Sequence, residues 1–227
     1  MCGRTVLVTP GDDLRELFAL DEIPPLVPRY NIAPTQPIAV IREPRRLELL
    51  RWGLILPRSM GPGINVRVET AARVPAYRES FQKRRCLVIV DGFYEWKRLG
   101  KKAKQPYLIH REDGRPWAFA GIWTTSTTKD GELIDTCAII TGEARGVVVE
   151  LHDRMPIAIG AEAFDRWLDP NVRDVADLLL PDALGLIAHP VSPAVNTAAN
   201  DDPRCLERVE PMGPRGNLSL FYRSHHH

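Results

Sequence analysis

Short apolar runs rich in β-branched and aromatic residues recur along the chain, and Gly, Pro, Asn or Asp residues separate them. Such runs predict strands, because branched and aromatic side chains pack well on a pleated, half-buried surface. Strands are expected at Thr5–Thr9, Ile38–Ile41, Leu47–Trp52, Cys86–Val90, Gly92–Lys97, Tyr107–His110, Trp117–Thr124 and Leu133–Thr141.

Apolar residues at helical spacing occur in fewer segments. Helices are expected at Asp12–Leu20, Pro75–Arg84, Glu143–Leu151, Glu162–Trp167 and Val172–Leu180. Strands and helices do not alternate strictly, which disfavours a doubly wound parallel sheet. We therefore expect an α+β fold with a β-rich, mostly antiparallel, curled or barrel-like sheet and peripheral helices.

The pattern contains no linker long enough to separate two domains, so a single domain is expected over residues 1–224. The three His residues at 225–227 are interpreted as the remnant of an expression tag. The basic run Lys97–Lys104 is predicted to be a solvated hairpin loop between two strands.

Composition excludes several classes of protein. The formal net charge of +1 gives no overall positive field, so any anionic partner must be bound by a local cluster. No apolar stretch has the length of a membrane-spanning helix, and Arg4, Asp12 and Asp13 interrupt the N-terminal segment. We expect a monomer without membrane contact in the cytoplasm, associated with the nucleoid if the source is bacterial.

The four cysteines, Cys2, Cys86, Cys137 and Cys205, lie far apart and form no CxxC pair. A structural zinc site is therefore not expected, and without a secretion signal neither is a disulfide framework. No metal or cofactor is expected.

Cys2 carries the most specific chemical signal. A small residue after the initiator Met favours removal of Met1, which leaves an α-amine and a thiol on adjacent carbons. Such a 1,2-aminothiol condenses with an aldehyde to a Schiff base, and the thiol then closes a thiazolidine ring. The α-amine titrates at about 7.7–8.0, so part of it is free base near neutral pH. An ordinary small residue in an N-terminal strand is the alternative.

Three further segments place polar residues in apolar surroundings. In Asn65–Thr70, extended geometry would put Asn65, Arg67 and Glu69 on one face. Glu95 lies among aromatic residues, where loss of solvent would raise the pKa of its carboxyl and suit proton transfer. His152 ends a predicted helix, whose dipole favours a protonated ring and a role as general acid. A polar edge strand, a surface Glu and a capping His are the alternatives.

The segments RYNIAPT and RWGL contain arginines, which can bind phosphate through two N–H groups, and aromatic residues, on which bases can stack. Turn and core positions are the alternative for both segments. Together with these, the segments MCGR, INVRVET, FQKRRCLVIVDGFYEW, HDRMP and HPVSPAVN resemble the SOS response-associated peptidase (SRAP) family. The resemblance covers residues 2 to about 197. The family pattern NARxET has Val66 in place of Ala here, a change on the expected core side.

The resemblance implies a DNA-repair function. Family members recognise abasic sites in single-stranded DNA and bond to the exposed aldehyde through the N-terminal cysteine. It implies that Cys2 is the nucleophile, that Asn65 positions the cysteine and the sugar, that Glu95 is the carboxylate near the amine, and that His152 assists ring opening. The expected DNA contacts are Arg4, Arg67, Arg154, Arg84, Arg85 and Trp52, with single-strand/double-strand junctions as one expected form of the substrate.

Two alternatives from other classes stay open. A cysteine peptidase would use Cys2 as nucleophile, His152 as base and Glu95 as orienting group. A non-covalent single-stranded DNA-binding protein would use only arginines and aromatic residues. The family name is interpreted as describing removal of Met1 rather than digestion of other proteins. An SRAP-type enzyme is therefore expected, with peptidase-like autoprocessing and a lyase-like, crosslinking chemistry at abasic sites.

Overall fold

The computed structural model describes all residues except 1, 57–62, 101–102, 129, 182–184 and 213–227. The interpretation of residues 225–227 as a tag therefore lies outside the described residues, and the single-domain assignment stays a prediction. No helix in the described part of the chain is long and apolar enough to cross a membrane.

Five strands of the larger sheet close on themselves into a barrel. Their pairings form the circuit β10–β4–β3–β6–β9–β10, and three short strands extend it at its edges. The circuit consists of β3 (Pro37–Arg42), β4 (Arg46–Trp52), β6 (Arg85–Val90), β9 (Trp117–Thr127) and β10 (Leu133–Glu143). The edge strands are β5 (Asn65–Arg67), β11 (Arg154–Pro156) and β12 (Ala158–Ile159).

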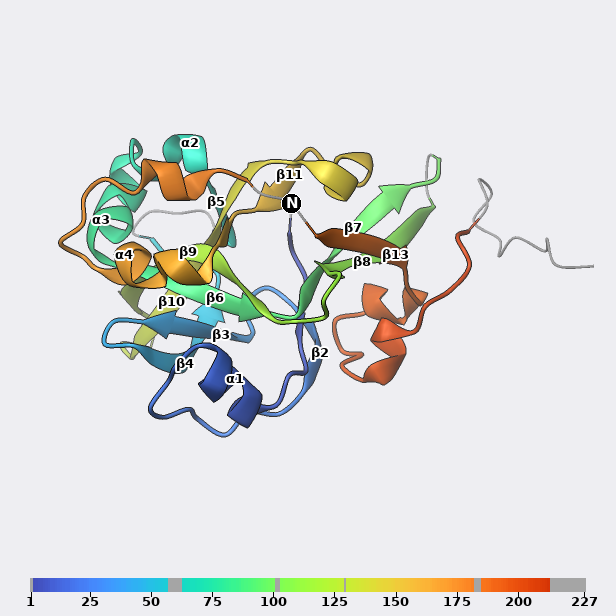
Figure 1. Ribbon diagram of the computed structural model, residues 1–227, viewed down its shortest axis with the longest axis horizontal. Helices are drawn as coiled ribbons and strands as arrows, with labels where there is room; N and C mark the ends of the chain where they lie inside the picture. The colour runs from blue at the N-terminus through green and yellow to red at the C-terminus, as the bar shows by residue number, and fades with distance from the viewer. Residues whose placement is uncertain (1, 57–62, 101–102, 129, 182–184, 213–227) are drawn as a thin grey trace, which may run out of the picture.

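A second, antiparallel sheet stands beside the barrel (Figure 1). Its strand order is β13–β8–β7–β1–β2. The strands are β1 (Thr5–Leu7), β2 (Arg29–Ile32), β7 (Gly92–Arg98), β8 (Lys104–Arg111) and β13 (Leu186–Pro190). Phe93 of β7 packs against Trp117 and Phe119 of β9, with ring centroids 6.1 and 5.9 Å apart, so aromatic contacts join the sheet to the barrel.

Helices cover the periphery (Figure 1). The α-helices are α1 (Gly11–Leu17), α2 (Val68–Ala71), α3 (Pro75–Lys83) and α4 (Phe164–Leu168). The 3-10 helices are η1 (Gly146–Glu150), η2 (Ala161–Ala163), η3 (Ala176–Leu179), η4 (Pro193–Asn196) and η5 (Pro203–Leu206). This arrangement confirms the predicted β-rich α+β fold with a barrel-like sheet.

Two predicted helices are wrong. Glu143 ends β10, and only Gly146–Glu150 forms a helical turn, of the 3-10 type. Val172–Leu180 contains only the 3-10 turn Ala176–Leu179. In the first segment η1 is rich in β-branched Val, which disfavours an α-helix, and Pro156 fixes an extended exit that pairs with β10.

Candidate functional site

The chain enters β1 between the β5–β11 edge of the barrel and the five-stranded sheet (Figure 1). Backbone pairing of β1 with β7 sets the position of Cys2. Thr5 is paired with Phe93, and the Tyr94 N–H donates to the Arg4 carbonyl oxygen at 2.9 Å. Because the strands are antiparallel, the residues before Arg4 run alongside those after Tyr94, which brings Cys2 towards Glu95.

Cys2 is fully buried. Burial raises the pKa of its thiol well above the ordinary value, and the nearby charge of Glu95 raises that pKa further. The thiol is therefore protonated at neutral pH. All four cysteines of the chain are buried and free.

Asn65 contacts Cys2 directly. Its Nδ2 donates a hydrogen bond of 2.7 Å to the Cys2 carbonyl oxygen. Its Oδ1 is buried and has no hydrogen-bond partner in the structure. Strand β5 pairs in parallel with β10, with Ile139 opposite Asn65 and Thr141 opposite Arg67, so Asn65 and Thr141 lie on the same face.

Thr141 is a further candidate site residue that the sequence did not indicate. It is fully buried, and its Oγ1 also has no hydrogen-bond partner in the structure. Buried polar atoms in native proteins nearly always have a partner. The unpaired oxygens of Asn65 and Thr141 on one face therefore favour a polar ligand such as a sugar hydroxyl. The sequence signal was a Thr near the end of an otherwise apolar strand.

Glu95 is only 4 % exposed. Burial raises the pKa of its carboxyl, and the charges nearby, including that of His152, oppose the shift. Side chains alternate across β7, because Phe93 joins the barrel core whereas Tyr94 and Trp96 pack in a second apolar cluster. Glu95 thus lies on the side of β7 that faces the barrel.

His152 follows η1, and its backbone N–H donates to the Val148 carbonyl at 2.9 Å. A five-residue 3-10 helix replaces the predicted helix, so a full helix dipole is not available to this ring. Nδ1 accepts from the Arg154 N–H at 3.0 Å and lies 2.6 Å from Asp153 Oδ1. A single ring nitrogen meets the first group as a lone pair and the second as an N–H, so the two contacts at Nδ1 are alternatives.

Glu95 and His152 line one groove of about 490 Å³. That volume lies within the range of small-molecule sites, about 300–1,000 Å³. The groove therefore brings together two of the residues that the sequence predicted for proton transfer.

The predicted DNA contacts divide into several groups. Arg67 is exposed at the end of β5. Arg154 forks onto the Glu69 carboxylate at 2.6 and 2.9 Å and donates to the Thr141 carbonyl. The sequence predicted that Glu69 continues the strand of Asn65. This is wrong, because α2 begins at Val68.

Arg4 is also partly committed to the fold. Its Nη1 donates to Asn31 Oδ1 and to the Val195 carbonyl, both at 2.7 Å, and its guanidinium lies 5.8 Å from the ring centre of Trp96. Burial lowers its pKa. Arg4 thus links the N-terminal strand to the segment HPVSPAVN.

The structure contradicts two predicted contacts. Trp52 is fully buried and its indole N–H donates to the Ile64 carbonyl, so it is a core residue. Arg85 is 3 % exposed and donates to backbone carbonyls, so it ties elements together and does not face DNA. These carbonyls belong to Phe81, Gln82, Trp167, Asp169 and Val172. Arg84 pairs with Glu79 in a separate hollow lined by Thr124–Thr127.

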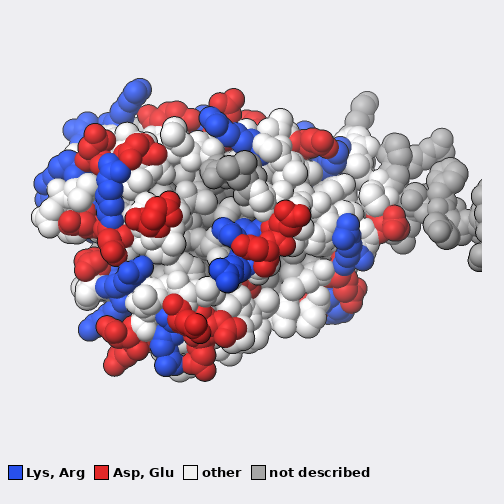
Figure 2. All heavy atoms as spheres, in the orientation of Figure 1, with Lys and Arg blue, Asp and Glu red and all other residues white. Residues whose placement is uncertain are grey.

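Charges of both signs are interspersed over the face shown in Figure 2. This agrees with the net charge of +1, and it means that an anionic partner must be bound locally. Among the described residues, no group of three or more His, Cys, Asp or Glu side chains gathers in a way that could hold a metal.

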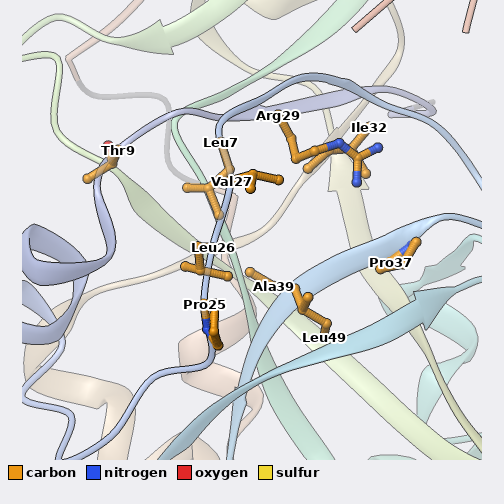
Figure 3. A pocket seen from close by; sticks show the side chains of 10 residues that line it. All are labelled: Leu7, Thr9, Pro25, Leu26, Val27, Arg29, Ile32, Pro37, Ala39 and Leu49. Atoms are coloured by element: carbon orange, nitrogen blue, oxygen red, sulfur yellow. The ribbon is translucent and has the colours of Figure 1, made fainter. Parts of the chain in front are cut away.

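A second, smaller pocket of about 70 Å³ lies beside β1 and β2 (Figure 3). Its lining is mainly aliphatic, with Leu7, Leu26 and Leu49 among the residues. Its one charged residue, Arg29, already donates to Asp201 and Gln36. This pocket contains neither a nucleophile nor an acid–base pair, so the groove at Glu95 and His152 is the candidate site.

Comparison with known proteins points to one family. The model of the SOS response associated peptidase (SRAP) family matches residues 1–198. The abasic site processing protein YoqW of Bacillus subtilis is 37 % identical, over 91 % of this chain and 99 % of its own length. YedK of Escherichia coli, with the same description, is 31 % identical over 92 % of this chain and 100 % of its own.

Solved structures show the same fold. A protein from Bacteroides thetaiotaomicron superimposes with a TM-score of 0.81 at 23 % identity, over 92 % of this chain and 100 % of its own. A phage-related protein from Bordetella bronchiseptica superimposes with a TM-score of 0.70 at 31 % identity, over 84 % of this chain and 94 % of its own.

Proposed function

Because the chain belongs to the SOS response-associated peptidase family, we propose that it processes abasic sites in DNA by bonding to them covalently through Cys2. The proposal is supported by relatives described as abasic site processing proteins. The observation that carries it is the hydrogen bond from Asn65 to the Cys2 carbonyl, next to the groove that holds Glu95 and His152.

The reaction begins with the abasic sugar. A closed abasic deoxyribose opens when its ring oxygen gains a proton and its C1 hydroxyl loses one, which yields an aldehyde. His152 serves as the acid, because it lines the same groove as Glu95. Glu95, whose carboxyl pKa is raised by burial, exchanges protons with the reacting groups.

The order of bond formation follows from the thiol. The amine of Cys2, freed by loss of Met1, attacks the aldehyde carbon and water leaves, which forms a C=N bond. The buried thiol is protonated and therefore a poor first nucleophile. It then adds its sulfur to the same carbon while its proton passes to the nitrogen, and the thiazolidine ring closes.

The substrate form is single-stranded DNA, including single-strand/double-strand junctions, bound by a monomer. Cys2 is fully buried, so the reacting sugar must leave any base stack to reach it. Extrusion costs least where the nucleotide is already unpaired. Arg67 is the principal phosphate ligand, whereas Arg4 and Arg154 mainly position their own strands.

A cysteine peptidase is disfavoured as the main activity, because it requires a thiolate and both burial and Glu95 raise the pKa of this thiol. The peptidase step that we retain is removal of Met1. Release of Met1 is required before the amine can react, since the nitrogen of an internal cysteine is an amide.

Intact-mass measurement after incubation with abasic single-stranded DNA tests the proposal. The expected product has the mass of the chain without Met1 plus the DNA minus one water. Cys2→Ala keeps the amine, so it should form only a Schiff base that borohydride traps, while Cys137→Ala, another buried thiol, should behave as the wild type. A heat-stable adduct from Cys2→Ala at the wild-type level would refute thiazolidine formation.

Two further arms separate the alternatives. Acetylation of the Cys2 amine leaves the thiol free, so it abolishes the adduct but would spare a thiol peptidase. A complex that dissociates on denaturation would identify a non-covalent DNA-binding protein.

A further inference from the structure

The groove at Glu95 and His152 continues along the hairpin of β7 and β8. Its other lining residues include Lys97, Arg98 and Lys104. The groove therefore holds three cations as well as Glu95 and His152. The sequence had predicted only a solvated loop for this basic run.

The cations of the hairpin are arranged unfavourably for the protein alone. Arg98 lies directly opposite Lys104 in the antiparallel ladder. Like charges at directly opposed positions destabilise a strand pair. The structure records no hydrogen bond or ion pair for either side chain with another described residue. Lys97, by contrast, pairs with Glu150 at 3.2 Å.

An anion at the hairpin would relieve this repulsion. Arg98 is three residues beyond Glu95, which is about 10 Å along an antiparallel strand. This odd spacing starts its side chain from the opposite face of β7, yet Arg98 and Lys104 both line the same groove as Glu95. A polymer whose reacting sugar lies at Glu95 and His152 therefore has further phosphates in front of Arg98 and Lys104. Single-stranded nucleic acid binds in this way, through a positive groove that follows its backbone.

We propose that the β7–β8 hairpin is the track for the single-stranded DNA next to the lesion, with Arg98 and Lys104 as its phosphate ligands. This inference rests on the proposed function, because it takes the reacting sugar to lie at Glu95 and His152. Glu150 lines the same groove and weakens DNA binding there, because its negative charge repels phosphate and its carboxylate pairs with Lys97.

The double variant Arg98→Ala/Lys104→Ala tests the track. Its matched control is Arg46→Ala/Lys83→Ala, which removes two exposed cations that do not line the groove. Single-turnover crosslinking is measured against DNA concentration at several salt concentrations. The DNA concentration for half-maximal rate should rise, and the salt slope should fall by about 1.4, from about 0.7 for each lost contact. The maximal rate should stay within twofold, and the control should match the wild type.

Glu150→Gln should act in the opposite direction and lower the half-saturating concentration. Fluorescence anisotropy with an intact single strand repeats both comparisons without chemistry, so the track is tested even if no adduct forms. Absence of a wild-type adduct would refute the proposed function alone. An unchanged salt slope in the double variant, or a fall in maximal rate without a change in half-saturation, would overturn the track.

Discussion

The side-chain amide of Asn65 donates a 2.7 Å hydrogen bond to the carbonyl oxygen of Cys2, which joins the edge of the barrel to the N-terminal strand. A backbone carbonyl that is fixed in this way also fixes the amine and thiol of the same residue. The contact therefore restrains the backbone of the residue that is proposed to react, although it touches neither the sulfur nor the nitrogen.

Asn65→Ala should slow crosslinking at saturating abasic DNA by about fivefold, because loss of one hydrogen bond of about 1 kcal/mol loosens the reacting geometry. DNA affinity should change less than twofold, since Asn65 contacts Cys2. Single-turnover rates and anisotropy measure the two quantities. Asn171→Ala, which removes a surface amide bonded to Asp169, is the control. Loss of affinity at an unchanged maximal rate would instead make Asn65 a DNA ligand.

Glu95→Gln and His152→Ala should each slow crosslinking by about 10²–10⁴, the usual contribution of a general acid or base. Both keep the DNA affinity, because neither residue is assigned to a phosphate. By microscopic reversibility, release of the bound sugar should slow as well. Rates of formation and reversal that both stay within twofold of wild type would show that these residues are structural.

Much of the fold could be predicted because local pattern and tertiary burial agree. Strand β6 is buried at every residue, and its apolar run predicts a strand there. The closed circuit could not be predicted, because the parallel pairs of β10 with β4 and β5 join segments far apart in sequence. Glu143–Leu151 was wrong because helical spacing there competes with pairing between β10 and β11.

The limits of the site prediction are clearest at two neighbouring arginines. Arg84 and Arg85 look equivalent in the sequence, yet Arg85 begins β6 and points into the core, whereas Arg84 lies outside with Glu79. Only the strand register separates them. Thr141 and the opposed pair Arg98 and Lys104 were missed for the same reason, since their meaning depends on which strand lies alongside.

Buried Glu95 should make stability depend on pH. Its carboxyl pKa is higher in the folded state than the ordinary 4.5, chiefly through burial. The folded chain therefore binds this proton more tightly, and the resulting stabilisation is complete below the unfolded pKa and is lost as pH rises through the folded pKa. Glu95→Gln removes this titration, so its stability relative to wild type should increase from about pH 4 upwards. Urea unfolding at pH 4, 6 and 8 measures this, and parallel curves would contradict it.

Arg67 should contribute to DNA affinity through its charge without affecting the maximal rate of crosslinking. Arg67→Ala should weaken binding at moderate salt and lower the log–log salt slope by about 0.7, the value for one phosphate contact on a single strand. The maximal crosslinking rate at saturating DNA should stay within twofold. Arg46→Ala, which removes an exposed cation on β4, is the control. An unchanged salt slope would remove Arg67 from the phosphate ligands.

Arg85→Ala should destabilise the fold by at least about 3 kcal/mol, because several buried backbone carbonyls lose a charged donor and each unsatisfied group costs about 1–3 kcal/mol. Arg84→Ala is the matched control from the adjacent position. Its loss breaks a surface ion pair with Glu79, which is typically worth less than about 1 kcal/mol. Urea unfolding of both variants measures the difference, and anisotropy should show wild-type salt slopes for whichever variant stays folded. Equal stabilities, or a reduced salt slope in folded Arg85→Ala, would return Arg85 to the DNA-binding surface that the sequence predicted.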